Sequence, residues 1–493
     1  MKPGGSGALG EWWRPAPASP ARRGPAGRIA APASARALTA PPGRPIPARP
    51  IPGRPIPGRP APRPGHTLVM TARPEAPPGG AVPFVALTAF SFILLLAPQA
   101  LFPVLAPLRL ALVAAAIAIG GHVSSAVMSG RPVTIHTREI ALVAILGGWA
   151  LVTVPFSLWP GGSLALLTGI FFKSLALFGL NANLVTSARR LKALAWLFAL
   201  AGVPLALTAW RHASEGRLMG GSDEAVKRIA GYEAPLTANP NDLALMLNLL
   251  LPFAAALAIL DRRPLVKAVL WGICGLDAVG VVLTYSRGGF LTLMTLGTLL
   301  AIDRLKGKGL AALVIVPVAA CLALGLWLVP PSYLQHMETI TDYRSDPTGS
   351  AQARLSDMIT ATGIALRHPF IGAGLGMNTI ALNEARDRPA WKMVHDVYLQ
   401  YAVDLGLLGV GVFVALYLSC LGRARRAARS PGGPPGSDAA VIKECGRALR
   451  NGLIAFGVAA IFHPVAYHFY FYGMGGLAVA VGRLSGGSPN AAA

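Results

Sequence analysis

Residues 394–420 read VHDVYLQYAVDLGLLGVGVFVALYLSC, a histidine and an aspartate followed by an apolar run. A helix that crosses a bilayer needs about 20 predominantly apolar residues, and this run is long enough. The histidine, His395, follows the one long polar interval between apolar runs, residues 330–394. The sequence therefore predicts a large polar loop that leads directly into a membrane helix.

The composition of the whole chain supports a membrane protein. Of its 493 residues, 53% are hydrophobic and 13% are charged, whereas a soluble domain usually carries about 25% charged residues. Apolar runs of roughly 18 to 22 residues recur along the chain. Within lipid, only helices and closed barrels satisfy the hydrogen bonds of the backbone. Because these runs are continuous rather than alternating, we predict an all-α, polytopic helical membrane protein.

We expect about 12 transmembrane helices, within a range of roughly 10 to 13. They are placed near residues 82–99, 103–127, 139–157, 163–182, 190–210, 242–260, 266–285, 288–303, 310–329, 396–420, 448–465 and 467–484. The predicted organisation is a disordered Pro/Arg-rich cytoplasmic tail (1–80), helices 1–9 (81–329), a large periplasmic loop with an amphipathic helix (330–395), helices 10–12 (396–484) and a C-terminal tail (485–493). Met70 would make a reasonable start of translation.

The net charge of +23 indicates topology rather than nucleic-acid binding. The basic residues gather in the N-terminal tail and in short loops between apolar runs, as they do on the cytoplasmic side of membrane proteins. This distribution predicts that both termini are cytoplasmic and that the long loop lies outside. No CxxC, metal-ligand spacing or nucleotide motif is present, so we expect no metal and no cofactor.

His395 is the first candidate for chemistry, because imidazole titrates near neutral pH and often acts as a general base. Asp396 and Asp404 follow it, so a carboxylate could orient the ring. The alternative is a histidine at the membrane interface with no role. In the loop before it, Leu355 to Leu366 form an apolar helical face that we expect to lie along the membrane surface.

Two arginines lie on the predicted outer face, where cations are usually sparse. Arg287 lies in a tight Ser-Arg-Gly-Gly turn, and its planar guanidinium suits a phosphate, although it could also simply cap a helix end. Arg228 comes shortly before Asn239-Pro240-Asn241. The start of a helix, with Asn239 as its cap, is enough to explain these three residues.

Two further features have simpler explanations. Residues 372–376, Gly-Ala-Gly-Leu-Gly, could present backbone amides to an anion, but a flexible turn accounts for them as well. His463 and His468 flank a stretch rich in Tyr and Phe that an interfacial aromatic belt explains.

Taken together and in this order, four segments resemble the O-antigen ligase and polysaccharide polymerase family of bacterial inner-membrane proteins. They are Arg228-Ile229-Ala230-Gly231-Tyr232 with Asn239-Pro240-Asn241, then Thr284-Tyr285-Ser286-Arg287-Gly288-Gly289, then Arg354 with Arg367-His368-Pro369 and the glycine stretch, and finally His395-Asp396-Val397-Tyr398-Leu399. The family usually has Asn where this chain has Asp396, which leaves the role of that position open.

The resemblance implies a glycosyltransferase that works at the periplasmic face of the bacterial inner membrane. The donor would be a glycan on undecaprenyl diphosphate, and the acceptor a lipid A core sugar, a second lipid-linked glycan or a protein hydroxyl. Arg228 and Arg287 would bind the diphosphate, and His395 would deprotonate the acceptor. Further substrate contacts would come from Arg354, Asn241, Asp396, Tyr398 and His368.

Several alternatives stay open at this point. The sequence does not decide between ligase and polymerase. A transporter or flippase of lipid-linked glycan would need no catalytic base, and a channel or receptor with a sensing loop is a third possibility. Transporters often contain repeated halves, and none is visible here.

Overall fold

The computed structural model describes residues 80–219, 228–229, 231–232, 237, 239–305, 350–386 and 391–486. All of them belong to the second of the chain's two units, Thr71–Ala493. The predicted tail, apart from Gly80, and the predicted ninth helix, 310–329, lie outside the described residues.

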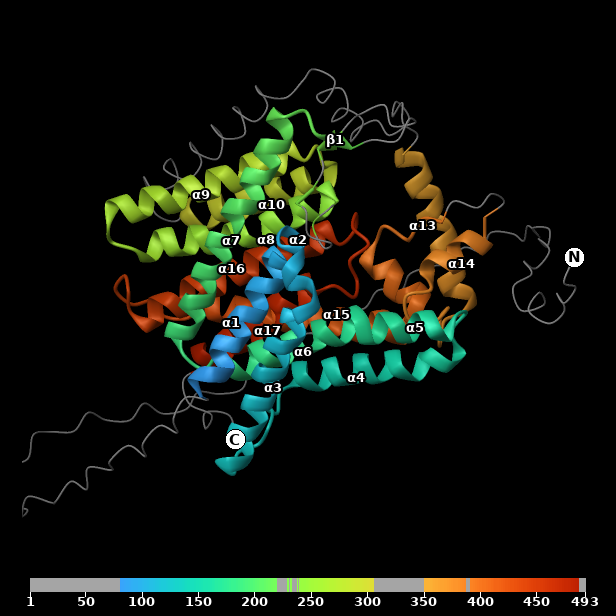
Figure 1. The fold of residues 1–493 in the computed structure, drawn as a ribbon, viewed down its shortest axis with the longest axis horizontal. Coiled ribbons are helices and arrows are strands. Elements are labelled where there is room, and N and C mark those ends of the chain that lie inside the picture. The colour runs from blue at the N-terminus through green and yellow to red at the C-terminus, as the bar shows by residue number, and fades with distance from the viewer. Residues whose placement is uncertain are drawn as a thin grey trace, which may run out of the picture. The chain divides into compact units, whose positions relative to one another are not determined.

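The described part is almost entirely helical, as predicted (Figure 1). Its only strands are the two-residue β1 and β2, which pair antiparallel. In chain order the elements are α1 (Ala81–Leu96), α2 (Pro98–Leu101), the 3-10 helix η1 (Pro103–Leu108), α3 (Leu110–Met128), α4 (Arg138–Thr153), the 3-10 turn η2 (Val154–Phe156), α5 (Pro160–Leu166), the π-helical turn η3 (Leu167–Phe171), α6 (Phe172–Leu184), α7 (Ala188–Ser214), β1 (Leu218–Met219), β2 (Arg228–Ile229), α8 (Pro240–Leu260), α9 (Pro264–Leu283), α10 (Arg287–Leu305), α13 (Ser350–Arg367), α14 (Asn378–Glu384), α15 (Val397–Arg429), α16 (Asp438–Ala459) and α17 (Phe469–Ser485).

Every predicted helix within the described residues overlaps an observed one, but the count of about 12 membrane spans is not confirmed. By length and apolar composition, seven helical segments of the described part could cross a membrane. They are Pro103–Met128, Arg138–Phe156, Pro160–Leu184, Ala188–Ser214, Pro240–Leu260, Pro264–Leu283 and Val397–Arg429.

The predicted helix 448–465 is wrong at both ends. α16 begins at Asp438, because the Ser437 side chain accepts a hydrogen bond from the Ala440 amide and caps it, and it ends at Ala459. Its first half therefore carries charged residues, which the apolar pattern had excluded from the helix.

α8 lies at the centre of the bundle and is almost completely buried. It packs against α7, α9 and α16, and α10 and α17 complete the core around α16. Outer helices instead expose large apolar side chains, among them Val104, Met128 and Phe156. Side chains of this kind are suited to contact lipid.

α15 is broken at Gly406, whose φ of 70° and ψ of −173° are not helical. The break frees carbonyl groups, and the glycine-rich loop docks onto them. The Ala373 amide donates to the Val403 oxygen (2.7 Å), and the Gly374 amide donates to the Asp404 oxygen (2.9 Å). These two amides are therefore already bound, which argues against an anion nest, and the loop is a docked segment rather than a free turn.

The predicted apolar face of α13 points away from the protein core. Leu355, Ile359 and Leu366 are exposed, whereas Ala361 and Ile364 on the opposite face are buried. In Figure 1 α13 and α14 (orange) lie beside one end of α15, and both pack against it.

Candidate functional site

The first turn of α8 provides one side of the candidate site. Asn239 caps the helix, since its side chain accepts a hydrogen bond from the Asn241 amide at 2.8 Å, and Pro240 follows at the first helical position. The Asn241 side-chain oxygen accepts a hydrogen bond from the Ser286 hydroxyl, also at 2.8 Å. Its backbone oxygen lies 3.0 Å from Nε2 of His463. Asn241 therefore connects α8 to two distant segments.

Arg287 is the first residue of α10 and follows directly on Ser286. The Ser286 hydroxyl oxygen accepts a hydrogen bond from the Gly289 amide at 3.1 Å, which is typical of a helix N-cap. A Cβ on Gly288 would lie 3.4 Å from Cε1 of His463, so the start of α10 is packed directly against the turn that contains this histidine. Arg287 itself is half-buried.

His395 lies on the short segment between α14 and α15, and backbone contacts hold this segment on both sides. The Val394 amide donates to the side-chain oxygen of Asn378 (3.1 Å), and the Val397 amide donates to the Ala460 oxygen (2.8 Å). The second contact attaches the His395 segment to the end of α16, three residues before His463.

The electrostatics of His395 show which groups surround it. Burial lowers its pKa to about 4, and the charges of Arg354 and His463 act in the same direction. A hydrogen bond with the Met393 backbone and the charge of Asp357 oppose this shift. His395 is therefore neutral at physiological pH and able to accept a proton.

The two carboxylates that could have oriented His395 have other described partners. Asp396 is buried and caps α15, accepting a hydrogen bond from the Leu399 amide at 2.8 Å. Asp404 accepts hydrogen bonds from the Asn378 side chain and the Tyr467 hydroxyl, both at 2.9 Å. Asp404 thus acts on the His395 segment indirectly, through Asn378.

The other predicted substrate contacts lie on α13, just after it, and on α15. Arg354 is half-buried on α13, one turn before Asp357, which forms an ion pair with Arg386. His368 follows the end of α13, and burial lowers its pKa. The Tyr398 hydroxyl donates to the Gly457 oxygen at 3.1 Å and so joins α15 to α16.

Arg228 lies on β2, where its backbone pairs with Met219 of β1. Its side chain lies outside the described part of the structure.

Five residues from separate segments thus converge, and we call them the basic cluster: Asn241, Arg287, Arg354, His395 and His463. Sequence reasoning identified four of them and missed His463, which it attributed to an aromatic belt. The available signal was the pair His463-Pro464, which interrupts an apolar run. Within the described part of the chain, no group of His, Cys, Asp and Glu could hold a metal ion.

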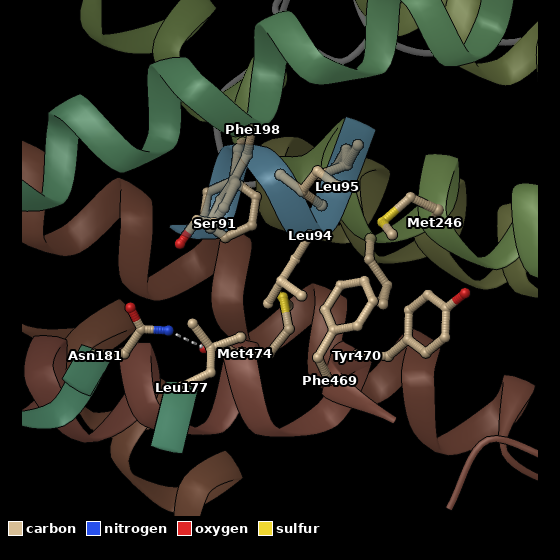
Figure 2. A pocket seen from close by; sticks show the side chains of 14 residues that line it. Ser91, Leu94, Leu95, Leu177, Asn181, Phe198, Met246, Phe469, Tyr470 and Met474 are labelled. Atoms are coloured by element: carbon tan, nitrogen blue, oxygen red, sulfur yellow. Dashed lines mark hydrogen bonds between the residues drawn. The ribbon is translucent and has the colours of Figure 1, made fainter. Parts of the chain in front are cut away.

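An apolar pocket lies among α1, α6, α7, α8 and α17. Figure 2 shows Phe469, Tyr470 and Met474 of α17 on one side of it and Leu94 and Leu95 of α1 on another. α6, α7 and α8 complete its lining through Leu177, Asn181, Phe198, Met246, Leu249, Leu250 and Phe253. Met246 is five residues, or about 1.4 helical turns, beyond Asn241, so part of the pocket wall follows the first turn of α8.

Comparison with protein families gives a match at residues 272–414, to a family described as O-antigen ligase. The matched region runs from α9 into α15 and contains Arg287, Arg354 and His395. Asn241 and His463 lie outside it. The comparison with curated proteins gives no match.

Proposed function

We propose that the basic cluster transfers a glycan from a lipid diphosphate to an acceptor hydroxyl. The match at residues 272–414 supports a bacterial membrane protein of the O-antigen ligase and polysaccharide polymerase family. The family implies a glycosyltransferase-like membrane enzyme. The observation that carries the finer proposal is a chain of neighbours: Arg354 and His463 act on His395 electrostatically, and His463 contacts Asn241 and packs against the start of α10. A pair of arginines beside a neutral histidine suits a reaction that expels an anionic leaving group from a sugar.

The reaction is a single displacement at the anomeric carbon. His395 takes the proton of the acceptor hydroxyl, and the oxygen forms a bond to the anomeric carbon. The bond from that carbon to the diphosphate oxygen breaks, and the electron pair leaves with the diphosphate. Arg287 and Arg354 neutralise the charge of the departing lipid diphosphate, with Arg228 as a further cation. One displacement inverts the anomeric configuration.

The apolar pocket supports a lipid-linked donor. Its lining is almost entirely aliphatic and aromatic, and Met246 in this lining lies about 1.4 helical turns beyond Asn241. The first isoprene units of an undecaprenyl chain would fit such a space, while the diphosphate would reach the basic cluster. Asp396, Tyr398 and His368 remain candidates for contacts with the sugars.

The length of α8 and the charges at its end support an orientation in the membrane. This helix has 21 residues and is therefore about 30 Å long, which matches the thickness of the hydrocarbon core. It starts at the basic cluster and ends next to Arg262 and Arg263. Arginines in such short loops mark the cytoplasmic side, so we place the basic cluster at the periplasmic face of the inner membrane and both termini in the cytoplasm.

The test is a gene deletion rescued by wild type, His395→Ala or Arg287→Ala, with lipid A, free polysaccharide and lipid-linked glycan separated and profiled. The exposed His136, just before α4, provides a matched control as His136→Ala. Loss of glycan-capped lipid A with accumulation of long lipid-linked glycan indicates a ligase. Accumulation of single repeat units indicates a polymerase.

We expect the two cluster variants to fail and His136→Ala to rescue, at equal protein levels. Full rescue by both His395→Ala and Arg287→Ala would refute a catalytic role for the cluster. A transporter of lipid-linked glycan would then be the better explanation.

A further inference from the structure

His463 lies in the turn between α16 and α17, and it is 1% exposed. Its Nδ1 is 3.0 Å from the oxygen of Ala459, and its Nε2 is 3.0 Å from the oxygen of Asn241. Each ring nitrogen thus faces a backbone carbonyl, one on α16 and one on α8.

These two partners restrict the protonation state of the ring. A backbone carbonyl oxygen only accepts hydrogen bonds, and a neutral imidazole has one N–H and one bare nitrogen. In the neutral form, one of the two contacts would therefore bring a nitrogen lone pair against an oxygen lone pair. An imidazolium has an N–H on both nitrogens and satisfies both contacts.

The location of the ring adds a second reason. Ala459 is the last residue of α16, a helix of 22 residues, and the C-terminal end of a helix carries partial negative charge that stabilises a cation. Burial acts against a charged ring, and Arg287 directly precedes Gly288, the residue of α10 that packs against His463. Asp242 belongs to the first turn of α8, next to Asn241. His395, before α15, interacts electrostatically with His463, and His468 and Tyr470 follow along the chain near the start of α17.

We propose that His463 is held as an imidazolium that fixes the first turn of α8 to the end of α16 and adds positive charge to the diphosphate site. It is a positioning residue, since it acts through Asn241 and through its field on the other members of the cluster. The role in anion binding rests on the proposed function, whereas the protonation state does not.

The protonation state is tested by ¹⁵N NMR on the full chain in lipid nanodiscs, with histidine alone labelled. The chain has 9 histidines, so the His463 signals are assigned by difference from a His463→Gln sample. We expect the lost signals to be those of a ring with both nitrogens protonated near neutral pH. Signals of a neutral ring, with one bare nitrogen, would overturn the proposal.

His468→Gln is the matched control, because this histidine lies in the same turn and we expect its ring to be neutral. Burial lowers the pKa of His468 to about 4, so its signals should be those of a neutral ring.

The contribution to anion binding is tested with inorganic pyrophosphate as the probe. We expect His463→Gln to weaken pyrophosphate binding about tenfold, comparably to Arg287→Ala, and His468→Gln to leave it unchanged. Unchanged binding in His463→Gln alone would overturn the contribution of His463. Unchanged binding in Arg287→Ala as well would instead count against the proposed diphosphate site.

Discussion

The side chain of Asn378 donates a 2.9 Å hydrogen bond to Asp404, and its oxygen accepts the Val394 amide at 3.1 Å. A buried carboxylate inside the broken helix α15 therefore holds the residue that precedes His395. Tyr467 donates to the same carboxylate oxygen and extends the network to the start of α17. The position of His395 thus depends on contacts among α14, α15 and α17.

We expect Asp404→Ala to lower the free energy of unfolding by about 1–3 kcal/mol, because it leaves the polar groups of Asn378 and Tyr467 buried without their acceptor. Glycan transfer should fall more than protein level does, since the His395 segment loses its anchor. Thermal unfolding and transfer assays on the purified protein measure both. Asp438→Asn, at an exposed position, is the control, and a loss of stability with full activity would contradict the positioning role.

The pH dependence of transfer should reflect the lowered pKa of His395, which is about 4. A general base must be deprotonated, so kcat/KM should not fall as the pH drops from 8 to 6 and should decline only below about pH 5. Because the charge of Arg354 contributes to the lowered pKa, Arg354→Ala should move the decline to higher pH. Arg367→Ala on the same helix should leave the profile in place, and an unshifted profile in Arg354→Ala would contradict this interpretation.

The break in α15 requires glycine at position 406. A Cβ there would lie 2.3 Å from the Phe370 oxygen, and the φ of 70° with the ψ of −173° costs other residues about 1–3 kcal/mol. We expect Gly406→Ala to lower the melting temperature and to release the glycine-rich loop to proteolysis. Gly411→Ala, five residues further along, meets no neighbour within 4 Å and should be neutral or slightly stabilising. Equal stability of the two variants would show that the loop does not depend on the break.

Filling the apolar pocket should select against long lipid tails. Met246→Trp places extra volume in the pocket, and we expect it to raise the KM for a long-chain polyprenyl donor while changing little for a short-chain one. Leu200→Trp, at an exposed position on α7, is the control for an added Trp in the membrane region. An equal rise in KM for both donors would contradict a tail-binding role.

The exposed face of α13 should rest on the membrane surface. A fluorophore attached at Ile359→Cys should be quenched by lipids that carry a quencher near the headgroups, since Ile359 is 66% exposed and apolar. A label at Thr379→Cys on α14 serves as the comparison, because Thr379 belongs to the docked part of the loop. Equal accessibility of both labels to a water-soluble quencher would argue against membrane contact.

The part of the site that the sequence predicted consists of residues with distinctive local context. Arg287 in its tight turn and His395 at the end of a polar interval stood out because apolar helices surround them. The roles of Asp396 and Asp404 were not predictable in this way. Their hydrogen-bond partners are set by the capping of α15 and by a contact with Tyr467, 63 residues further along the chain.

The sequence by itself determined that the chain is helical and membrane-embedded. The length and continuity of its apolar runs are local properties, and they decide whether a segment can span a bilayer. Only the tertiary structure decided which polar groups meet, as with Asn241 and His463, which are 222 residues apart. It also decided that the apolar face of α13 turns outward while Ala361 and Ile364 turn inward. Such pairings depend on how helices pack, and packing is set by the shapes of many side chains together rather than by the pattern of any one segment.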